Sequence, residues 1–442
     1  MNITLGNEIY NEYKRKYRTA EQAIQFIEQG EDIIIPVTPG EPPALLNALS
    51  VYTNLTENRM YRMLPYFPTF NMEEERIKQV SLFLSGQDRL GFQQGTIDLL
   101  PSHFSDIPST LLQTTTKRVI MATVSKMDEN GYFSLGTSQS YVGPMVDKAK
   151  TIILEVNENM PRTFGVGNQI HISQVTVLIE NHVKIPVMTN PTLNEKDYKI
   201  GQTIADIIKN GDTLQIGFGA MPNAVMEFLE NHRDLGVYTE MLPDKIVDLY
   251  KSGAITNQNK NLYKGKTTAT FALGTQRLYD FIHENEDILM LPCDVCNDIR
   301  TISQMDNLVS VNSTVEIDFI GQCNSETING KYYSSSGGQG DFTKGVRLAK
   351  NGRGIICLYS TAKNDTISKI VPQLPQGAVV TTSKNDVDII VTEYGKAELK
   401  GKTIQERTEA LIKIAHPKFR EQLVYDAIKM GFLPQKNFYI KN

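Results

Sequence analysis

The stretch GDTLQIGFGAMPNAVMEFLENHRDLGVYTEMLPDKIVDLYKSG, residues 211–253, combines strand-like and helix-like patterns. An apolar run at 213–216 leads into the loop 217–222, whose final proline suits the first turn of the helix that follows. A second β-prone run, 237–239, ends at Glu240 and precedes another helix. The stretch therefore predicts two parallel strands that end side by side.

Ligands of parallel α/β sheets gather beyond the carboxyl ends of the strands, where the glycine loop 217–219 and Glu240 are both expected. Bare glycine backbone lets N–H groups approach a ligand closely. An isolated Gly-x-Gly is also typical of an ordinary tight βα turn, and a carboxylate at a strand end is often only a solvated loop residue. Other parts of the chain must decide between these interpretations.

The composition is that of a globular protein, with 442 residues, 40% hydrophobic and 21% charged. This length indicates two or three domains. The formal net charge of -5 and the lack of a dense basic stripe argue against a nucleic-acid partner. No apolar run approaches the roughly 20 residues that a membrane helix needs, and the polar N-terminus lacks the apolar core of a signal peptide. We therefore expect a soluble, cytoplasmic protein with no membrane partner.

Four cysteines are present, and only Cys293 and Cys296 are close in sequence. One Cys-x-x-Cys pair without a second ligand pair is weak support for a metal or redox site. We expect structural or free thiols and no metal.

Apolar runs alternate with helical patterns along the whole chain, which predicts two α/β domains with largely parallel sheets and a site between them. Residues 185–199 are polar and carry two prolines, so we place a domain boundary near residue 190. Asn130-Gly131 between two β-prone runs predicts a hairpin, and His416-Pro417 predicts a break in the C-terminal helix. The expected strands are 32–37, 80–84, 97–100, 119–124 and 151–156 in the first half and 269–274, 287–292, 310–326, 354–358 and 387–392 in the second.

The segment 334–342, SSSGGQGDF, has the highest glycine density in the chain. Its side chains cannot pack a core, so it is a candidate backbone cradle for an anion or a nucleotide. A plain flexible loop is the alternative.

Several motifs resemble one family when they are taken together. They are VTEYGKAELKGKTIQERTEALIKIAHPKFR at 391–420, SSGGQGDF at 335–342, EVNENMPRTFG at 155–165 and GVYTEM at 236–241. In this order they resemble the acetyl-CoA hydrolase/transferase family, which comprises class I CoA-transferases such as butyryl-CoA:acetate and 4-hydroxybutyrate CoA-transferases. The resemblance runs from about residue 30 to the C-terminus, and it implies two tandem CoA-transferase-like α/β domains, 1–190 and 191–442.

The resemblance also implies a mechanism. A glutamate carboxylate attacks the acyl-CoA thioester, and a glutamyl-CoA thioester forms through a mixed anhydride before a second acid reverses the sequence. Acyl activation is retained, so neither ATP, a metal nor a permanently bound cofactor is implied, and coenzyme A enters as part of the substrate. The family further suggests a homodimer or a higher homo-oligomer.

Carried over position by position, the resemblance makes Glu240 the nucleophile. It assigns coenzyme A contacts and oxyanion donors to two glycine elements, the first with the Phe218 or Gly219 amide as donor. It assigns a contact with a phosphate of coenzyme A to Lys363. Asn312 is a weaker match to a polar contact with coenzyme A. The residues so assigned are Gly217, Phe218, Gly219, Ala220, Met221, Gly338, Gly340, Lys363 and Asn312.

The chain departs from the family pattern at three places. Gly340 replaces a bulkier residue, Asn364-Asp365 replaces two glycines after the lysine, and Asn130-Gly131 replaces His-Gly. These departures concern the acyl pocket and fine contacts with coenzyme A. They leave the nucleophile in place.

Other residues compete for the catalytic role. Glu316, Glu326 and Glu393 lie near expected strand ends, where single carboxylates are often structural acceptors, and His171 alternates with apolar neighbours as a strand histidine does. No G-x-S-x-G elbow supports a serine hydrolase. Three functions remain. The first is a CoA-transferase that moves coenzyme A between a short-chain acyl-CoA (acetyl-, butyryl- or hydroxybutyryl-CoA) and a carboxylic acid such as acetate. The second is an acyl-CoA (acetyl-CoA) hydrolase that uses the same glutamate, and the third is a catalytically silent CoA-binding or regulatory protein. Water access separates the first two, and the sequence does not show it.

Overall fold

The computed structural model describes residues 3–68, 75–189, 191–217 and 219–435. The chain divides into two compact units, each treated by itself below. The first unit contains Met1–Thr189, Glu240–Asp244 and Lys266–Asn297, and the second contains Asn190–Thr239, Lys245–Gly265 and Asp298–Asn442. The predicted second domain, 191–442, therefore contributes two segments to the first unit, and one of them begins with Glu240.

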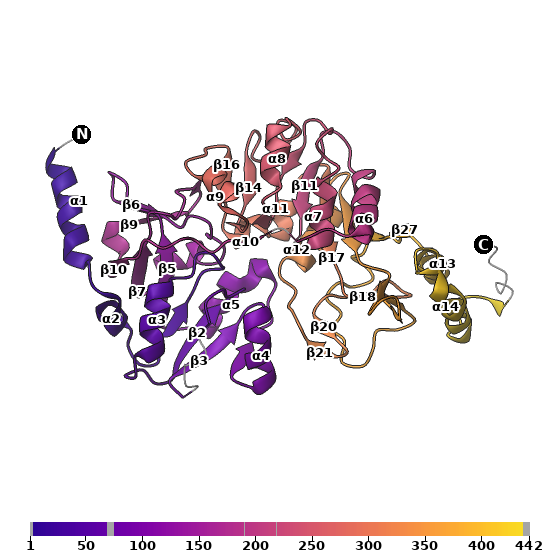
Figure 1. Cartoon of the computed structure of the whole chain (residues 1–442), viewed down its shortest axis with the longest axis horizontal. Coiled ribbons are helices and arrows are strands. Elements are labelled where there is room, and N and C mark those ends of the chain that lie inside the picture. Colours follow the sequence, from indigo (N-terminus) through magenta and orange to yellow (C-terminus); the bar gives the residue numbers. More distant parts are fainter. Residues whose placement is uncertain (1–2, 69–74, 190, 218, 436–442) are drawn as a thin grey trace. The chain divides into compact units, whose positions relative to one another are not determined.

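The first unit is built on a seven-stranded sheet in which all pairings are parallel, in the order β10-β7-β5-β1-β2-β3-β4 (Figure 1). Its strands are β1 (Asp32–Ile34), β2 (Asn58–Arg62), β3 (Ile77–Ser81), β4 (Ile97–Leu99), β5 (Arg118–Val124), β7 (Thr151–Val156) and β10 (Val177–Glu180).

Both faces of this sheet are buried, as parallel sheets require. Along β5, Val119 and Met121 belong to one apolar cluster, and Ile120 and Ala122 belong to another. This period-two alternation places the two clusters on opposite faces. It explains why residues 119–124 read as a continuous apolar run in the sequence.

Helices and three small sheets complete the first unit. The helices are α1 (Ile3–Lys16), α2 (Ala20–Ala23), α3 (Pro43–Val51), α4 (Gly86–Gln94), α5 (Ile107–Thr114), α9 (Gln276–Ile282) and α10 (Cys293–Cys296). The small sheets pair β13 (Met241–Leu242) with β15 (Phe271–Ala272), β14 (Thr267–Ala269) with β16 (Ile288–Met290) and β8 (Phe164–Gly165), and β6 (Tyr132–Ser134) with β9 (Gln169–His171).

The predicted hairpin around Asn130-Gly131 is only half right. The chain does turn there, with Gly131 at φ 85° and its N–H donating to the carbonyl of Asp128. Backbone hydrogen bonds also join the two sides of the turn, from the Asp128 N–H to the Tyr132 carbonyl and from the Ser125 N–H to the Ser134 carbonyl, both at 2.9 Å. However, the regular ladder of β6 is antiparallel to β9 and not to β5. The strand that follows the turn finds its partner more than thirty residues further on, which a local turn motif cannot specify.

The second unit contains a six-stranded sheet in the order β12-β11-β17-β22-β26-β27. The first five strands are parallel and β27 is antiparallel to β26. They are β11 (Thr213–Ile216), β12 (Gly236–Val237), β17 (Leu308–Ser313), β22 (Arg353–Cys357), β26 (Ile389–Thr392) and β27 (Gly395–Glu398).

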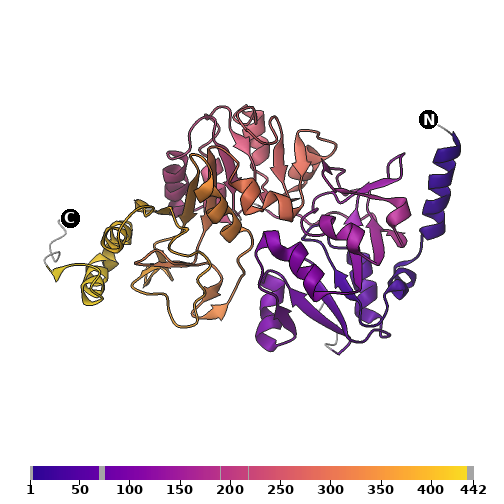
Figure 2. The ribbon, with the colours of Figure 1, turned by 180° about the vertical axis from the view of Figure 1, so that it is seen from behind.

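Seven helices of the described chain belong to the second unit. They are α6 (Glu195–Ala205), α7 (Ala220–Met226), α8 (Ile246–Lys251), α11 (Ile299–Ile302), α12 (Gln339–Leu348), α13 (Ile404–Lys413) and α14 (Pro417–Lys429). The last two lie side by side near the C-terminus in both views (Figures 1 and 2). They are separated at His416-Pro417, as the sequence predicts. Short pairs complete the unit: β18 (Glu316–Asp318) with β19 (Cys323–Asn324) and β25 (Ile370–Val371), β20 (Thr327–Ile328) with β21 (Lys331–Tyr332), and β23 (Thr361–Ala362) with β24 (Ile367–Ser368).

The predicted fold class, α/β with mostly parallel sheets, is confirmed. The expectation of free thiols is confirmed as well, because all four cysteines are buried and unbridged. Among the described residues, no helix combines the length and the apolar character needed to cross a membrane.

Candidate active site

The carboxyl edge of the second-unit sheet gathers most of the predicted site residues. β11, β17 and β22 are neighbours and parallel, so Gly217, Asn312 and the loop that carries Lys363 all lie at or beyond the same edge. α12 runs back from this edge toward the start of β22, which brings the Gly338 end of the helix to the same side. The topology thus places residues from four chain segments along one edge.

Gly217 and Asn312 are in direct contact. The Gly217 N–H donates to the Val311 carbonyl at 2.7 Å, and a Cβ at Gly217 would lie 2.8 Å from both that carbonyl oxygen and Asn312 Oδ1. Asn312 Nδ2 donates to Gln215 Oε1 at 3.0 Å, which fixes the asparagine in the sheet. Only glycine fits position 217 without displacing these neighbours.

The rest of the first glycine loop leads into α7. Gly219 has φ 129° and ψ 172°, a conformation that side chains of L-residues rarely adopt. Ala220 and Met221, which the sequence places in the loop, already form the start of the helix, and Pro222 lies within its first turn as predicted. Phe218, which the sequence proposes as an oxyanion donor, lies outside the described residues.

The second glycine element forms the start of a helix. Gly337 has φ 51°, Gly338 is the N-cap of α12, and Gly340 lies in the first turn. The Phe342 N–H donates to the Gly338 carbonyl at 3.0 Å. The segment therefore begins a helix and is not a plain loop, while the backbone cradle for an anion or a nucleotide stays a prediction.

Lys363 occupies an exposed left-handed turn between β23 and β24. Lys363, Asn364 and Asp365 have φ values of 49°, 54° and 61°. Asn and Asp tolerate this region better than other side chains, although glycine does so at least cost. The backbone of this turn gives a physical reason for the two family glycines that Asn364-Asp365 replaces. Asp365 Oδ1 accepts a hydrogen bond from Lys196 Nζ at 2.6 Å, which holds the turn to α6.

Glu240 directly follows the end of the second predicted strand. The Thr239 hydroxyl is 3.3 Å from both the N–H and the carbonyl oxygen of Ile216, the residue before Gly217. The next residue, Glu240, accepts hydrogen bonds at its carbonyl oxygen from the Thr270 and Phe271 N–H groups, at 2.9 and 3.2 Å. Glu240 thus follows in sequence a second-unit residue that is bonded to the end of β11, while its own hydrogen bonds lie in the first unit.

The Glu240 side chain has a partner that the sequence does not reveal. Asn297 Nδ2 donates to Glu240 Oε2 at 2.8 Å. Asn297 is completely buried and forms the C-cap of α10. It follows the Cys293-x-x-Cys296 pair in sequence, so the helix that these cysteines occupy serves to place an amide beside Glu240.

Of the three competing carboxylates, Glu316 and Glu393 have hydrogen bonds that agree with structural roles. Glu316 Oε1 accepts from Asn324 Nδ2 at 2.7 Å. Glu393 accepts from the N–H and the hydroxyl of Ser360, at 2.9 and 2.8 Å, and lies 3.5 Å from Lys196 Nζ. The third, Glu326, is buried. His171 ends β9 and its Nδ1 lies 2.8 Å from the Ser173 hydroxyl, which agrees with a structural role.

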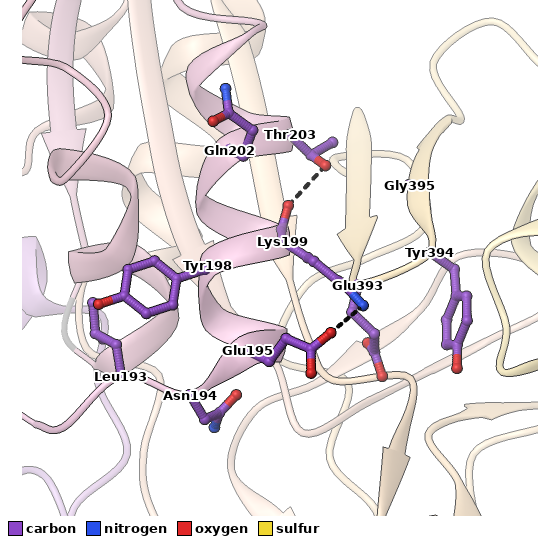
Figure 3. Close-up of a pocket in the computed structure, with 10 residues that line it drawn as sticks. All are labelled: Leu193, Asn194, Glu195, Tyr198, Lys199, Gln202, Thr203, Glu393, Tyr394 and Gly395. Atoms are coloured by element: carbon purple, nitrogen blue, oxygen red, sulfur yellow. Dashed lines mark hydrogen bonds and ion pairs between the residues drawn. The ribbon is translucent and has the colours of Figure 1, made fainter.

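A pocket of about 790 Å³ lies beside α6, and Figure 3 shows its lining. Glu195 and Lys199 form an ion pair of 2.7 Å there, with Tyr198 to one side and Tyr394 to the other (Figure 3). Of the residues singled out from the sequence, the pocket contains only Glu393. It is therefore distinct from the predicted site residues.

Comparison with known proteins identifies the family. The N-terminal domain model of the acetyl-CoA hydrolase/transferase family matches residues 1–189, and the C-terminal domain model matches residues 274–427. Together they cover well over half of the chain. The chain therefore belongs to the acetyl-CoA hydrolase/transferase family.

Relatives and solved structures cover nearly the whole length. A 4-hydroxybutyrate coenzyme A transferase of Clostridium kluyveri is 41% identical over 93% of this chain and 97% of its own. A succinyl-CoA:cyclohexane-1-carboxylate CoA transferase of Geobacter metallireducens is 40% identical over 95% and 97%. The crystal structure of RipA from Yersinia pestis has a TM-score of 0.91 and 37% identity, and it covers 96% of this chain and all of RipA. An acetyl-CoA hydrolase of Yarrowia lipolytica is more distant, at 30% identity over 57% of this chain and 49% of its own.

Proposed function

We propose that this protein is a CoA-transferase that moves coenzyme A between a short-chain acyl-CoA and a carboxylic acid such as acetate, with Glu240 as the nucleophile. The observation that supports the proposal most is the position of Glu240. It directly follows Thr239, whose hydroxyl is bonded to Ile216 at the end of β11, and its carboxylate accepts a hydrogen bond from buried Asn297. Support also comes from the relatives, because those named CoA-transferases match almost the entire chain, whereas the hydrolase matches about half.

The proposed chemistry is a double displacement. A carboxylate oxygen of Glu240 attacks the thioester carbonyl carbon, the C–S bond breaks, and the coenzyme A thiolate leaves a mixed anhydride. The thiolate then attacks the glutamyl carbonyl carbon and expels the first acid as its carboxylate, which gives a glutamyl-CoA thioester. A second carboxylate reverses these steps. Acyl activation is conserved throughout, so we propose no permanently bound cofactor, and chelators are expected to leave the rate unchanged.

The two glycine elements are proposed to stabilise the negative charge that develops on the carbonyl oxygen in each step. Each tetrahedral intermediate carries an oxyanion, and one well-placed donor is worth about 2.7 to 4 kcal/mol of transition-state stabilisation. We assign the donors to the backbone N–H groups of the Gly217–Met221 loop and of Gly338–Gly340. Asn312 is proposed to support the first loop, and the exposed Lys363 ammonium to meet a phosphate of coenzyme A.

The test is an exchange assay. The purified protein is incubated with acetyl-CoA with and without butyrate, and butyryl-CoA and free coenzyme A are followed by mass spectrometry. The variants are Glu240→Ala, Glu240→Gln and, as a matched control, Glu316→Gln. We expect butyryl-CoA from the native protein and from the control, and none from the Glu240 variants. Free coenzyme A that accumulates equally without butyrate would favour a hydrolase, and full activity in Glu240→Ala would rule out this nucleophile.

The covalent intermediate can be tested separately. Incubation with acyl-CoA in the absence of an acceptor acid should leave coenzyme A attached to the peptide that contains Glu240, and hydroxylamine should remove it. No such adduct is expected in Glu240→Gln. An adduct on another carboxylate would reassign the nucleophile.

The family resemblance also leads us to propose a homo-oligomer, most simply a dimer, that acts in the cytoplasm. Light scattering on the full chain tests the first point, since a monomeric mass at micromolar concentration would contradict it. Fractionation of the source cells tests the second.

A further inference from the structure

The second glycine element begins α12 with a backbone donor that the described chain does not use. Its N-cap residue, Gly338, has no side chain with which to cap the helix. The Gln339 N–H donates to the Ser336 carbonyl at 3.2 Å, and the Phe342 N–H donates to the Gly338 carbonyl at 3.0 Å. Within the described residues, the Gly340 N–H has no acceptor. Such a donor can stabilise an oxyanion only if the start of the helix is held in place.

The backbone alone does not hold it. Gly338 and Gly340 flank Gln339, and glycine has more conformational freedom than any other residue. Gln339 is therefore the one residue among these three that can fix the segment through a side chain. It is only 9% exposed, although long polar side chains are mostly found at the surface. A buried glutamine at this position needs a hydrogen-bond partner.

The Gln339 side chain is bonded to a segment that is distant in sequence. Its Nε2 donates to the Thr382 hydroxyl at 3.1 Å, and Thr382 is buried as well. The Thr382 N–H donates to the Cys323 carbonyl at 3.1 Å, and its carbonyl accepts from the Cys323 N–H at 3.0 Å. Cys323 pairs with Ile317, and both belong to the apolar core of the second unit. The Gln339–Thr382 bond thus joins the glycine element to that core.

The segment that receives this bond also adjoins the end of β17. Asn324, next to Cys323, donates from Nδ2 to Glu316 Oε1 at 2.7 Å, and its carbonyl accepts from the Thr314 hydroxyl at 2.8 Å. Thr314 directly follows β17, the strand that carries Asn312. The anchor of the second glycine element is therefore part of the framework that ends this strand.

A ring contact holds α12 from a second direction. The Phe342 and Tyr238 rings meet edge to face, with 6.3 Å between centroids and 64° between planes, and both residues are buried. Phe342 follows Gly340 by two residues, and Tyr238 precedes Glu240 by two residues. Aromatic pairs favour this edge-to-face geometry. The helix that begins with the glycine element thus packs against the segment that leads to the proposed nucleophile.

We propose that Gln339 is a positioning residue for CoA transfer, which through Thr382 holds the Gly340 N–H where it stabilises the oxyanion. The proposal rests on the proposed CoA-transferase function. Removal of a complete oxyanion donor lowers kcat by about 100- to 1,000-fold, so a displaced donor should cost part of that factor. The nucleophile itself does not depend on Gln339. Loss of the bond should therefore slow the reaction without abolishing it.

The test separates kcat from KM. Both are measured for acetyl-CoA with saturating butyrate in the native protein, in Gln339→Met, in Thr382→Val and in the double variant. Methionine keeps the length of the glutamine without its amide, and valine keeps the shape of the threonine without its hydroxyl. We expect kcat to fall by about tenfold in each single variant, with a much smaller change in KM. The double variant should be no slower than the slower single variant, because both remove the same bond.

Two further variants serve as controls. Thr382→Ser keeps the hydroxyl and should retain the native kcat. Thr408→Val makes the same exchange at another buried threonine of the second unit, whose hydroxyl donates to the Ile404 carbonyl at 2.8 Å, and should also retain it. Unchanged kcat in Gln339→Met, additive losses in the double variant, or a loss in either control as large as in Thr382→Val would overturn the proposal.

Absence of transfer by the native protein would instead refute the proposed function. In that event hydrogen exchange tests the positioning alone. Amide exchange in the peptide that contains Gly340, followed by mass spectrometry, should be faster in Gln339→Met and in Thr382→Val than in the native protein and in Thr408→Val. Equal exchange in all four proteins would overturn the inference.

Discussion

Asn297 Nδ2 donates a 2.8 Å hydrogen bond to Glu240 Oε2, and both residues lie in the first unit. A hydrogen bond to a charged group contributes about 1.5–3 kcal/mol. We therefore expect Asn297→Ala to lower kcat/KM for CoA transfer by about 10- to 100-fold. The matched control is Asn285→Ala, whose Nδ2 donates to the Phe281 carbonyl of α9 and whose Oδ1 accepts from the Asp287 N–H.

Asn297→Asp provides a second readout at the same contact. A carboxylate at this distance from Glu240 disfavours two negative charges and raises the pKa of the pair. The acid limb of the plot of kcat/KM against pH should therefore move to higher pH. An unchanged pH profile in this variant would show that the contact does not influence the nucleophile.

Gly217 should be intolerant of any side chain. Its added Cβ would lie 2.8 Å from Asn312 Oδ1 and from the Val311 carbonyl oxygen. We expect Gly217→Ala to cost about 1–3 kcal/mol of unfolding free energy and to raise KM for acyl-CoA. Gly86→Ala is the control, since nothing lies within 4 Å of its Cβ, and it should change stability by less than about 1 kcal/mol. Equal effects of the two substitutions would contradict this account.

Lys196 holds the turn that carries Lys363. Its ammonium bonds to Asp365 at 2.6 Å and to the Thr361 hydroxyl at 3.1 Å. Loss of this anchor in Lys196→Met should loosen the left-handed turn and raise KM for acyl-CoA about threefold to tenfold, with a smaller effect on kcat. Lys199→Met, which removes a surface pair with Glu195 one turn along the same helix, should leave KM unchanged. An equal rise in KM in both variants would show only a general loss of positive charge.

Glu155 should give the first unit a pH-dependent stability. Burial raises its pKa to about 7, against the hydrogen bonds from Asn181 Nδ2 and the Leu45 and Ala44 N–H groups, which lower it. Because the folded-state pKa exceeds the unfolded one, the unfolded chain binds fewer protons between pH 4.5 and 7, and stability falls as pH rises through this window.

The comparison variant is Glu155→Gln, an isostere of the protonated acid. The unfolding free energy of the native protein relative to this variant should fall between pH 4.5 and 7, by on the order of 3 kcal/mol, and stay constant above pH 7. Urea titrations at a series of pH values measure this difference. A difference that is independent of pH would place the Glu155 pKa near its usual value.

The sequence predicts the regular elements well because each has a strong local cause. The apolar run at 213–216, the Gly219 conformation and the proline in the first turn of α7 all act within ten residues. The break at His416-Pro417 has the same local origin. Pairing over long separations is not encoded in this way: the turn expected at Gly131 forms, but nothing local reveals that β6 pairs with β9.

The same distinction between local patterns and long-range pairing applies to the candidate site. Sequence motifs identify the glycine elements, Glu240 and Lys363, since each has a recognisable local pattern. Asn297 carries no motif, and it reaches Glu240 because β13 pairs with β15 and because the Cys293 N–H of α10 donates to the Ser140 carbonyl. Ordinary residues acquire their importance here through long-range pairing, which only the three-dimensional structure displays.

The first unit is assembled from three separate pieces of chain, so it is not a module in the genetic sense. A gene fragment that ends at residue 189 would encode neither β15 nor α10, and it would lack the segment that begins with Glu240. Such a fragment would lack Met241, Phe271 and Cys293, which belong to the core of the first unit. Recombination within this family should therefore be tolerated only when the two halves of the coding sequence travel together.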